Sequence, residues 1–160
     1  KMLKNNLKYI FFITVFAILG FSREFVFVNI NKQLFSLYYS RGDIQIPSSL
    51  SFINHFDYST LYYSKFYLTI IYFLAYFFAS YHAVKLISTD KKNAKWIIYI
   101  YSILLILSGI SMAYNYIINN QLNGYEYTFS RWLMGIAQSP LVTFFILASS
   151  KLYNKFQTEQ

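Results

Sequence analysis

Cysteine is absent from this sequence of 160 residues, and charged residues make up only 12% of it. Without a thiol the chain forms no disulfide and no cysteine-ligated metal site. Soluble domains carry about twice this share of charge, whereas 56% of this chain is hydrophobic. No phosphate-binding loop, zinc signature or haem-attachment motif is present either. We therefore expect a membrane protein with no cofactor, no metal site and no identifiable catalytic residue.

Acidic residues are also scarce, since six of them face 14 lysines and arginines, giving a net charge of +8. In a soluble protein this excess would suggest binding to nucleic acid. Here the lysines flank long apolar runs, which is typical of residues that orient membrane helices. The pattern indicates the lipid bilayer as the partner, and we expect no nucleic acid.

Hydrophobic runs of suitable length recur along the chain. A helix needs about 20 apolar residues to cross a hydrocarbon core of about 30 Å. The expected spans are 9–28, 66–87, 96–118 and 132–153. The first is interrupted at Ser22, Arg23 and Glu24, and its basic start also resembles a signal-peptide core. We interpret it as one helix, so the sequence predicts an all-α, polytopic four-transmembrane-helix bundle formed by a single integral membrane domain, 1–160.

The distribution of basic residues predicts the orientation of these spans. One side of the membrane would hold Lys1, Lys4, Lys8, Lys85, Lys91, Lys92, Lys95, Lys151 and Lys155. The positive-inside rule places this side, with both termini, in the cytoplasm. Residues 29–64 then form an outer loop, in which Pro47 and the Ser48-Ser49 pair predict the start of a short helix on the outer membrane face.

Small residues and one proline indicate how the spans pack. Small side chains let helices approach closely in lipid, so we expect contacts at Ala75, Ala79, Ala83, Gly109, Ala113, Gly135 and Ser139. Pro140 interrupts the fourth span and cannot donate to the carbonyl of Ile136. This predicts a kink or a polar substitute for the missing donor, and Gln138 and Ser139 beside it are the candidates for that substitute.

Arg23 and Glu24 are the most informative polar residues, because the first predicted helix carries them into the outer half of the hydrocarbon. A charge there costs about 2.5–3.5 kcal/mol, so each needs a partner. Arg131, Gly135 and Gln138 are spaced to share one helix face, and a Glu24–Arg131 contact is expected. The predicted polar cluster comprises Arg23, Glu24, Asn31, Glu126, Arg131 and Gln138.

Three interpretations of this cluster remain open. It is a structural network of ion pairs, or a site that binds or transfers an anionic lipid or a peptide carboxylate, which suits the planar fork of arginine. Alternatively, the arginines extend to the lipid headgroups and anchor the helix ends. His55 and Asp57 form a weaker acid–base or metal candidate, because no third ligand or nucleophile accompanies them.

The last span also carries a family resemblance. Its Arg131-Trp132-Leu133 and Gln138-Ser139-Pro140-Leu141 segments, together with Arg23, resemble the small membrane proteins associated with the exosortase F protein-sorting system of flavobacterial-type bacteria. The resemblance implies an accessory role in a bacterial-type inner (cytoplasmic) membrane. A sorting transpeptidase itself would need a catalytic cysteine, which this chain lacks.

Small size, sparse catalytic residues and an aromatic outer loop support the same leading hypothesis. It is a non-enzymatic accessory subunit that binds other membrane-protein subunits in a complex for secretion, protein sorting or envelope assembly. A membrane-embedded binding site for an anionic lipid or peptide is the alternative. Transport by one protomer is disfavoured, because the third span offers only a few small polar residues.

Overall fold

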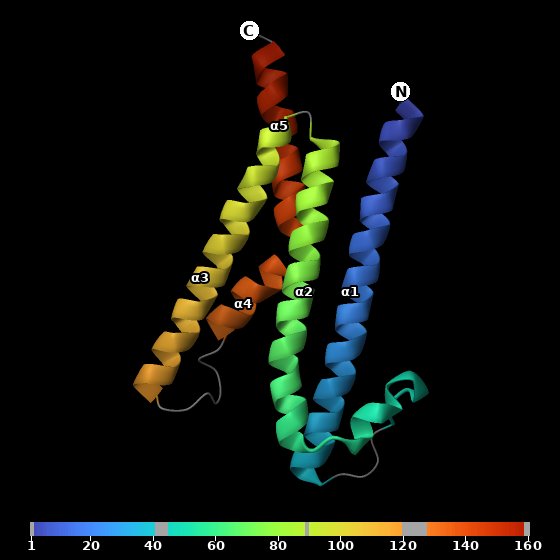
Figure 1. Ribbon diagram of the computed structural model, residues 1–160, viewed down its shortest axis with the longest axis vertical. Helices are drawn as coiled ribbons and strands as arrows, with labels where there is room; N and C mark the ends of the chain where they lie inside the picture. The colour runs from blue at the N-terminus through green and yellow to red at the C-terminus, as the bar shows by residue number, and fades with distance from the viewer. Residues whose placement is uncertain (1, 41–44, 89, 120–127, 159–160) are drawn as a thin grey trace. The chain divides into compact units, whose positions relative to one another are not determined.

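A computed structural model describes residues 2–40, 45–88, 90–119 and 128–158. All the regular structure in these ranges is helical, as expected for an all-α protein (Figure 1). The elements are α1 (Met2–Tyr39), η1 (Ser48–His55), α2 (Tyr58–Ile87), η2 (Lys91–Asn93), α3 (Ala94–Asn119), α4 (Thr128–Ala137) and α5 (Leu141–Thr158). Among the described residues, α1, α2 and α3 are long and apolar enough to cross a membrane, and the bent α4–α5 pair raises the number of spans to four if it counts as one.

Helix α1 is longer than the apolar run that predicted it. It continues without a break through Arg23 and Glu24 and ends at Tyr39, so residues 29–39 are helical rather than part of a loop. Ser40 follows with a φ of 52°, a left-handed conformation that commonly closes a helix. Helix α2 likewise begins at Tyr58, before the predicted start. The connection between α1 and α2 is therefore shorter than the sequence suggested.

The connection between α1 and α2 contains the expected short helix. It starts at Ser48 directly after Pro47, as predicted, and has 3-10 geometry. Asp57 then caps the start of α2, and a hydrogen bond from the Thr60 side chain is the main cause that lowers the pKa of the Asp57 carboxyl below its ordinary value. A side-chain cap therefore accompanies the start of α2, whereas η1 begins after Pro47 without one.

The chain forms two compact units: unit 1 contains residues 1–16 and 73–160, and unit 2 contains residues 17–72. In unit 1, hydroxyl groups join neighbouring helices. The Ser80 and Tyr101 hydroxyls are buried and 3.0 Å apart, linking α2 to α3. The Ser108 and Ser130 hydroxyls are buried and 2.6 Å apart, linking α3 to α4. Such hydrogen bonds are the usual means of joining helices inside a membrane.

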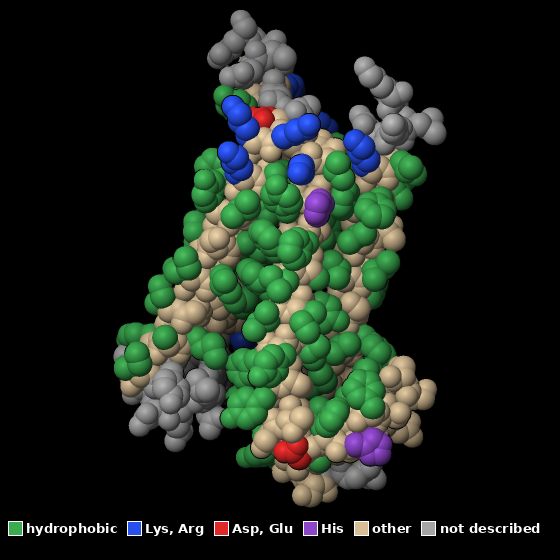
Figure 2. Space-filling model, in the orientation of Figure 1, with side chains coloured by type: hydrophobic (Ala, Val, Ile, Leu, Met, Phe, Trp, Pro, Cys, Tyr) green, Lys and Arg blue, Asp and Glu red, His purple; other side chains and the backbone are tan. Residues whose placement is uncertain are grey.

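One end of unit 1 gathers basic residues (Figure 2). The Asn93 amide donates to Ser88 and to Ser150, at 2.9 and 2.8 Å, which ties the α2–α3 connection to α5. Lys8 Nζ donates to the carbonyl of Leu86 at 3.3 Å. These contacts bring together the ends of helices that carry Lys8, Lys85, Lys91, Lys92, Lys95 and Lys151. This is the grouping that the orientation argument requires.

Unit 2 packs differently, around a small aliphatic cluster. Ile30 and Leu34 of α1, Ile53 of η1 and Leu61 of α2 are all buried and in contact. A polar contact adjoins this cluster, in which Lys65 Nζ donates to the Asn31 side-chain oxygen at 2.8 Å. Unit 2 therefore has a small apolar core to which α1, η1 and α2 all contribute.

The predicted packing of small residues is wrong for α3. Gly109 and Ala113 are exposed, and a Cβ added at Gly109 or at Gly135 would meet nothing within 4 Å. On α2, by contrast, Ala83 is fully buried. The buried hydroxyl pairs Ser80–Tyr101 and Ser108–Ser130 join α3 to its neighbours instead. A hydrogen bond attracts the two helices, whereas a small side chain only allows them to come close.

Candidate functional site

The helix break at Pro140 adjoins a concave feature lined by residues of both α4 and α5. Helix α4 ends at Ala137, α5 begins at Leu141, and the two are bent by 59°. The Ser139 hydroxyl donates to the carbonyl of Ile136 at 2.7 Å and accepts from the Leu141 amide at 3.4 Å. The predicted kink and the predicted substitute donor at Ile136 are both confirmed, and Ser139 supplies the donor.

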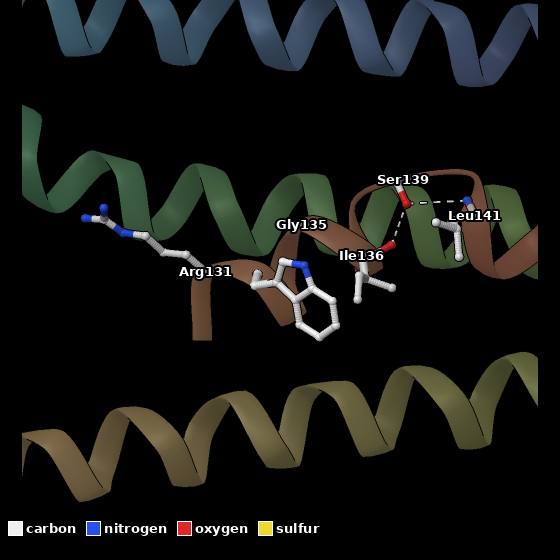
Figure 3. A pocket seen from close by; sticks show the side chains of 6 residues that line it. Arg131, Gly135, Ile136, Ser139 and Leu141 are labelled. Carbon is white, nitrogen blue, oxygen red and sulfur yellow. Dashed lines mark hydrogen bonds between the residues drawn. The ribbon is translucent and has the colours of Figure 1, made fainter. Parts of the chain in front are cut away.

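An open groove of about 500 Å³ lies beside this bend. We call it the α4–α5 groove, and its lining residues are Arg131, Trp132, Gly135, Ile136, Ser139 and Leu141. Figure 3 shows the Arg131 side chain extending away from Ser139 and Leu141, so that the cation is at one end and the apolar wall at the other. A single positive charge thus borders an apolar surface.

Gly135 keeps the groove open. A Cβ placed there would meet no atom within 4 Å, so the position accepts a larger side chain without displacing a neighbour. Glycine at this point is therefore not required for close helix packing. Its effect is to leave free the space between Arg131 and Ile136 on the helix surface.

Polar side chains lie behind the groove, on the buried side of the same break. Gln138 and Thr143 are 4% and 1% exposed. The Thr143 hydroxyl has no hydrogen-bond partner among the described residues. The break therefore has an outward face with the groove and an inward face that is polar and closed.

The predicted polar cluster is distributed over both units. Arg23, Glu24 and Asn31 belong to unit 2, whereas Arg131 and Gln138 belong to unit 1. Glu126 lies outside the described residues. The Glu24–Arg131 contact, and a single site made by all six residues, therefore remain predictions.

Within unit 2 the three predicted residues have separate surroundings. The Arg23 guanidinium carbon lies 5.5 Å from the ring centroid of Phe27, a distance typical of a cation–π contact. Glu24 is exposed, and Asn31 accepts from Lys65. Sequence reasoning missed Lys65 because Asn31, its hydrogen-bond partner on another helix, is 34 positions away in the sequence. Residue spacing does not indicate contacts at this separation.

Arg131 and Gly135 line the groove, whereas Gln138 is buried and does not line it. The Gln138 amide still donates to the carbonyl of Met134 at 2.9 Å, so the helical hydrogen-bond pattern continues to Gln138. The expected shared face of Arg131, Gly135 and Gln138 therefore remains a prediction. The apolar residues Trp132, Ile136 and Leu141 were missed as lining residues; Pro140 in their midst was the signal that could have found them.

The weaker candidate pair in the outer connection has a structural use. Asp57 accepts hydrogen bonds at the start of α2 rather than facing a metal or a substrate. Within the described ranges, no group of three or more His, Asp and Glu side chains is placed to hold a metal ion. His55 and Asp57 thus provide no chemistry that the fold reveals.

Comparison of the chain with protein-family models, with curated proteins and with solved structures finds no match.

Proposed function

We propose that this chain is a four-span protein of a bacterial-type inner membrane, with both termini in the cytoplasm. The α4–α5 pair counts as one broken span in this proposal. Support comes from the lysines gathered at one end of unit 1, where α5 meets the α2–α3 connection. A positive end of this kind remains on the cytoplasmic side during insertion. Reporter fusions after residues 8, 90 and 158 test the topology, and all three should report the cytoplasm.

Within that membrane, we propose a non-enzymatic accessory role in a complex for secretion, sorting or envelope assembly. The observation that carries this proposal is an exposed aromatic surface on unit 2. The surface comprises six aromatic residues near the connection between α1 and α2, each at least 42% exposed: Tyr38, Tyr39, Phe52, Phe56, Tyr58 and Tyr63. We call these residues the aromatic surface. Tyr38 and Tyr58 come from different helices, and their ring centroids are 6.2 Å apart.

Helix length supports placing this surface in water. Helix α1 has 38 residues, about 57 Å, which exceeds the hydrocarbon thickness by about 27 Å. In this proposal the hydrogen bond between Asn31 and Lys65 in unit 2 marks the edge of the hydrocarbon, because a charged side chain is costly deeper in the membrane. Tyr38, Tyr39 and Tyr58 are farther along their helices, on the side away from the long apolar segments. Exposed aromatic patches in water favour protein partners.

Co-purification tests the accessory role. A tagged chain extracted in a mild detergent should return a membrane-protein partner in fixed stoichiometry. The triple variant Tyr38→Ser, Tyr39→Ser, Tyr58→Ser should lose that partner, because it removes half of the aromatic surface. It should still fold, because these three rings are outside the buried cluster of unit 2. The matched control is Tyr67→Ser, which removes a 70% exposed ring from the apolar part of α2 and should retain the partner. A monodisperse wild-type monomer without a partner would contradict the proposal.

A second candidate function follows from the α4–α5 groove. Its single arginine beside an apolar wall suits an anionic group attached to an apolar chain, such as an anionic lipid or a peptide carboxylate. The groove, rather than the six-residue cluster, is the observation that favours this function. The variant Arg131→Gln is expected to lose binding of the anionic group while it still inserts into the membrane and folds.

A further inference from the structure

We propose that the α4–α5 groove holds an anionic phospholipid, with its phosphate on Arg131 and an acyl chain along Trp132, Ile136 and Leu141. This inference rests on the proposed membrane topology and narrows the second candidate function to one class of ligand. Three properties of unit 1 lead to it: the depth of the groove, its lateral opening and the position of its charge.

Contacts within unit 1 set the depth of the groove. Lys95 and Lys151 mark one membrane boundary on α3 and α5. Along α3, Ser108 lies about 20 Å from Lys95, and its hydroxyl touches Ser130, the neighbour of Arg131 in sequence. Along α5, Leu141 lies about 15 Å from Lys151. Both distances fall inside a hydrocarbon core of about 30 Å, so the break is near its middle and the start of α4 is in the opposite half.

The opening of the groove faces lipid rather than the interior of unit 1. Trp132 and Leu141, at its two ends, are 62% and 58% exposed, whereas Ala137 and Gln138 on the other side of the break are buried. A ligand therefore enters sideways from the bilayer. Lipids already occupy that space, while a peptide carboxylate would have to leave water and enter hydrocarbon at a large cost.

Charge selects the anionic headgroup. Backbone atoms of Arg131 lie about 10 Å below the far boundary by the same count along α3, and its side chain extends away from the apolar end of the groove (Figure 3). A long arginine side chain at this depth extends toward the headgroups while its stem stays among apolar groups, and the phosphate is drawn inward to meet it. The planar guanidinium then makes paired hydrogen bonds to phosphate oxygens. The same geometry leaves the acyl chain next to the apolar wall.

Lipid retention tests the proposal. The full chain is incorporated into nanodiscs of equal phosphatidylglycerol and phosphatidylcholine, released, and examined by native mass spectrometry for bound lipid. Wild type should retain phosphatidylglycerol in preference to phosphatidylcholine. Arg131→Gln should lower phosphatidylglycerol occupancy about tenfold, the loss expected for a charge-assisted hydrogen bond. Arg131→Lys should lose less, since it keeps the charge without the fork.

Two further variants separate the groove from general electrostatic attraction. Gly135→Leu places a bulky side chain at a position where an added Cβ meets nothing within 4 Å, so it should fill the groove and also reduce occupancy while Arg131 is unchanged. Lys151→Gln removes the same charge at the other boundary and should retain wild-type occupancy. Equal retention of phosphatidylglycerol by wild type and Arg131→Gln, or no preference over phosphatidylcholine, would overturn the lipid assignment. Extraction of the wild-type chain from membranes by alkaline carbonate would instead overturn the topology on which it rests.

Discussion

Unit 1 and unit 2 differ in the buried contacts that join their helices, although α1 and α2 contribute to both. Unit 1 combines a buried apolar interior, which includes Ile97 and Leu133, with two buried hydroxyl pairs, Ser80 with Tyr101 and Ser108 with Ser130. Unit 2 has an aliphatic cluster that includes Ile53 and Leu61. Lipid provides no hydrophobic drive for helices to associate, whereas water does. We propose that the part of unit 2 around this cluster lies in water, while the hydroxyl pairs of unit 1 lie in lipid.

The largest expected effect is on the aliphatic cluster of unit 2. Leu61 is 2% exposed, so Leu61→Ala should destabilise unit 2 by about 2–5 kcal/mol through lost burial and a cavity. Limited proteolysis of the connection around η1 measures this as faster cleavage. Leu37→Ala, at a position 38% exposed, is the control and should cut at nearly the wild-type rate. Similar rates for both variants would show that water does not surround this unit.

The buried hydroxyl pair between α2 and α3 should have the next largest effect. Ser80→Ala leaves the Tyr101 hydroxyl buried without its partner, at a cost of about 1–2 kcal/mol. Tyr101→Phe added to Ser80→Ala should restore part of this loss, since both polar groups are then gone. Thermal unfolding of the four chains in one detergent gives the coupling energy. A coupling of zero would show that the 3.0 Å contact contributes nothing to stability.

The pair between α3 and α4 should contribute less, because α4 is short and linked to α5 by a break. A double-mutant cycle of Ser108→Ala and Ser130→Ala should give a coupling of about 0.6 kcal/mol, the average for hydrogen bonds between membrane helices. The same cycle sharpens the depth argument, because the proposed position of Arg131 depends on this contact. Additive single effects would remove that support.

The smallest expected effect is a pH dependence at the start of α2. The folded pKa of Asp57 lies below its ordinary value of 3.8, so its ionised form is the one that folding favours. Its contribution is fully present above the unfolded pKa and is lost as the pH falls below 3.8 through the folded pKa. The protection factors of the amides at Tyr58–Leu61, measured relative to intrinsic exchange at each pH, should therefore fall in acid. Asp57→Asn should remove the change, and an unchanged pH profile in that variant would exclude Asp57 as its source.

Sequence reasoning located the apolar segments and the break but misplaced helix ends. Hydrophobic length reports where lipid begins, and Asn29 to Gln33 were therefore assigned to a loop. In the structure this polar stretch continues α1, because Ile30 and Leu34 within and beside it pack into the cluster of unit 2. Helices continue past the membrane when a core in water can cover them. The contacts in this cluster join residues that are far apart in the sequence, so no local sequence pattern indicates them.

The candidate site was anticipated at its chemical centre and not in its shape. Pro140 predicted the interruption at Ile136, and Ser139 fills the role expected of a nearby polar residue. Periodicity indicated neither the bend of 59° between α4 and α5 nor the groove, which Arg131 lines and the buried Gln138 does not. Gly109 and Gly135 were assigned to helix contacts, yet both are open. Composition identifies small residues, but only the fold shows which side they occupy.

The most direct test of this two-solvent account is the depth of spin labels along the chain. Because cysteine is absent, single cysteines at Gly135, Ser139 and Tyr39 take a nitroxide label without background. In lipid bilayers, the labels at Gly135 and Ser139 should be relaxed by dissolved oxygen and protected from a water-soluble nickel complex, while the label at Tyr39 should show the reverse. Accessibility of the Ser139 label to nickel, or burial of the Tyr39 label in lipid, would contradict the account.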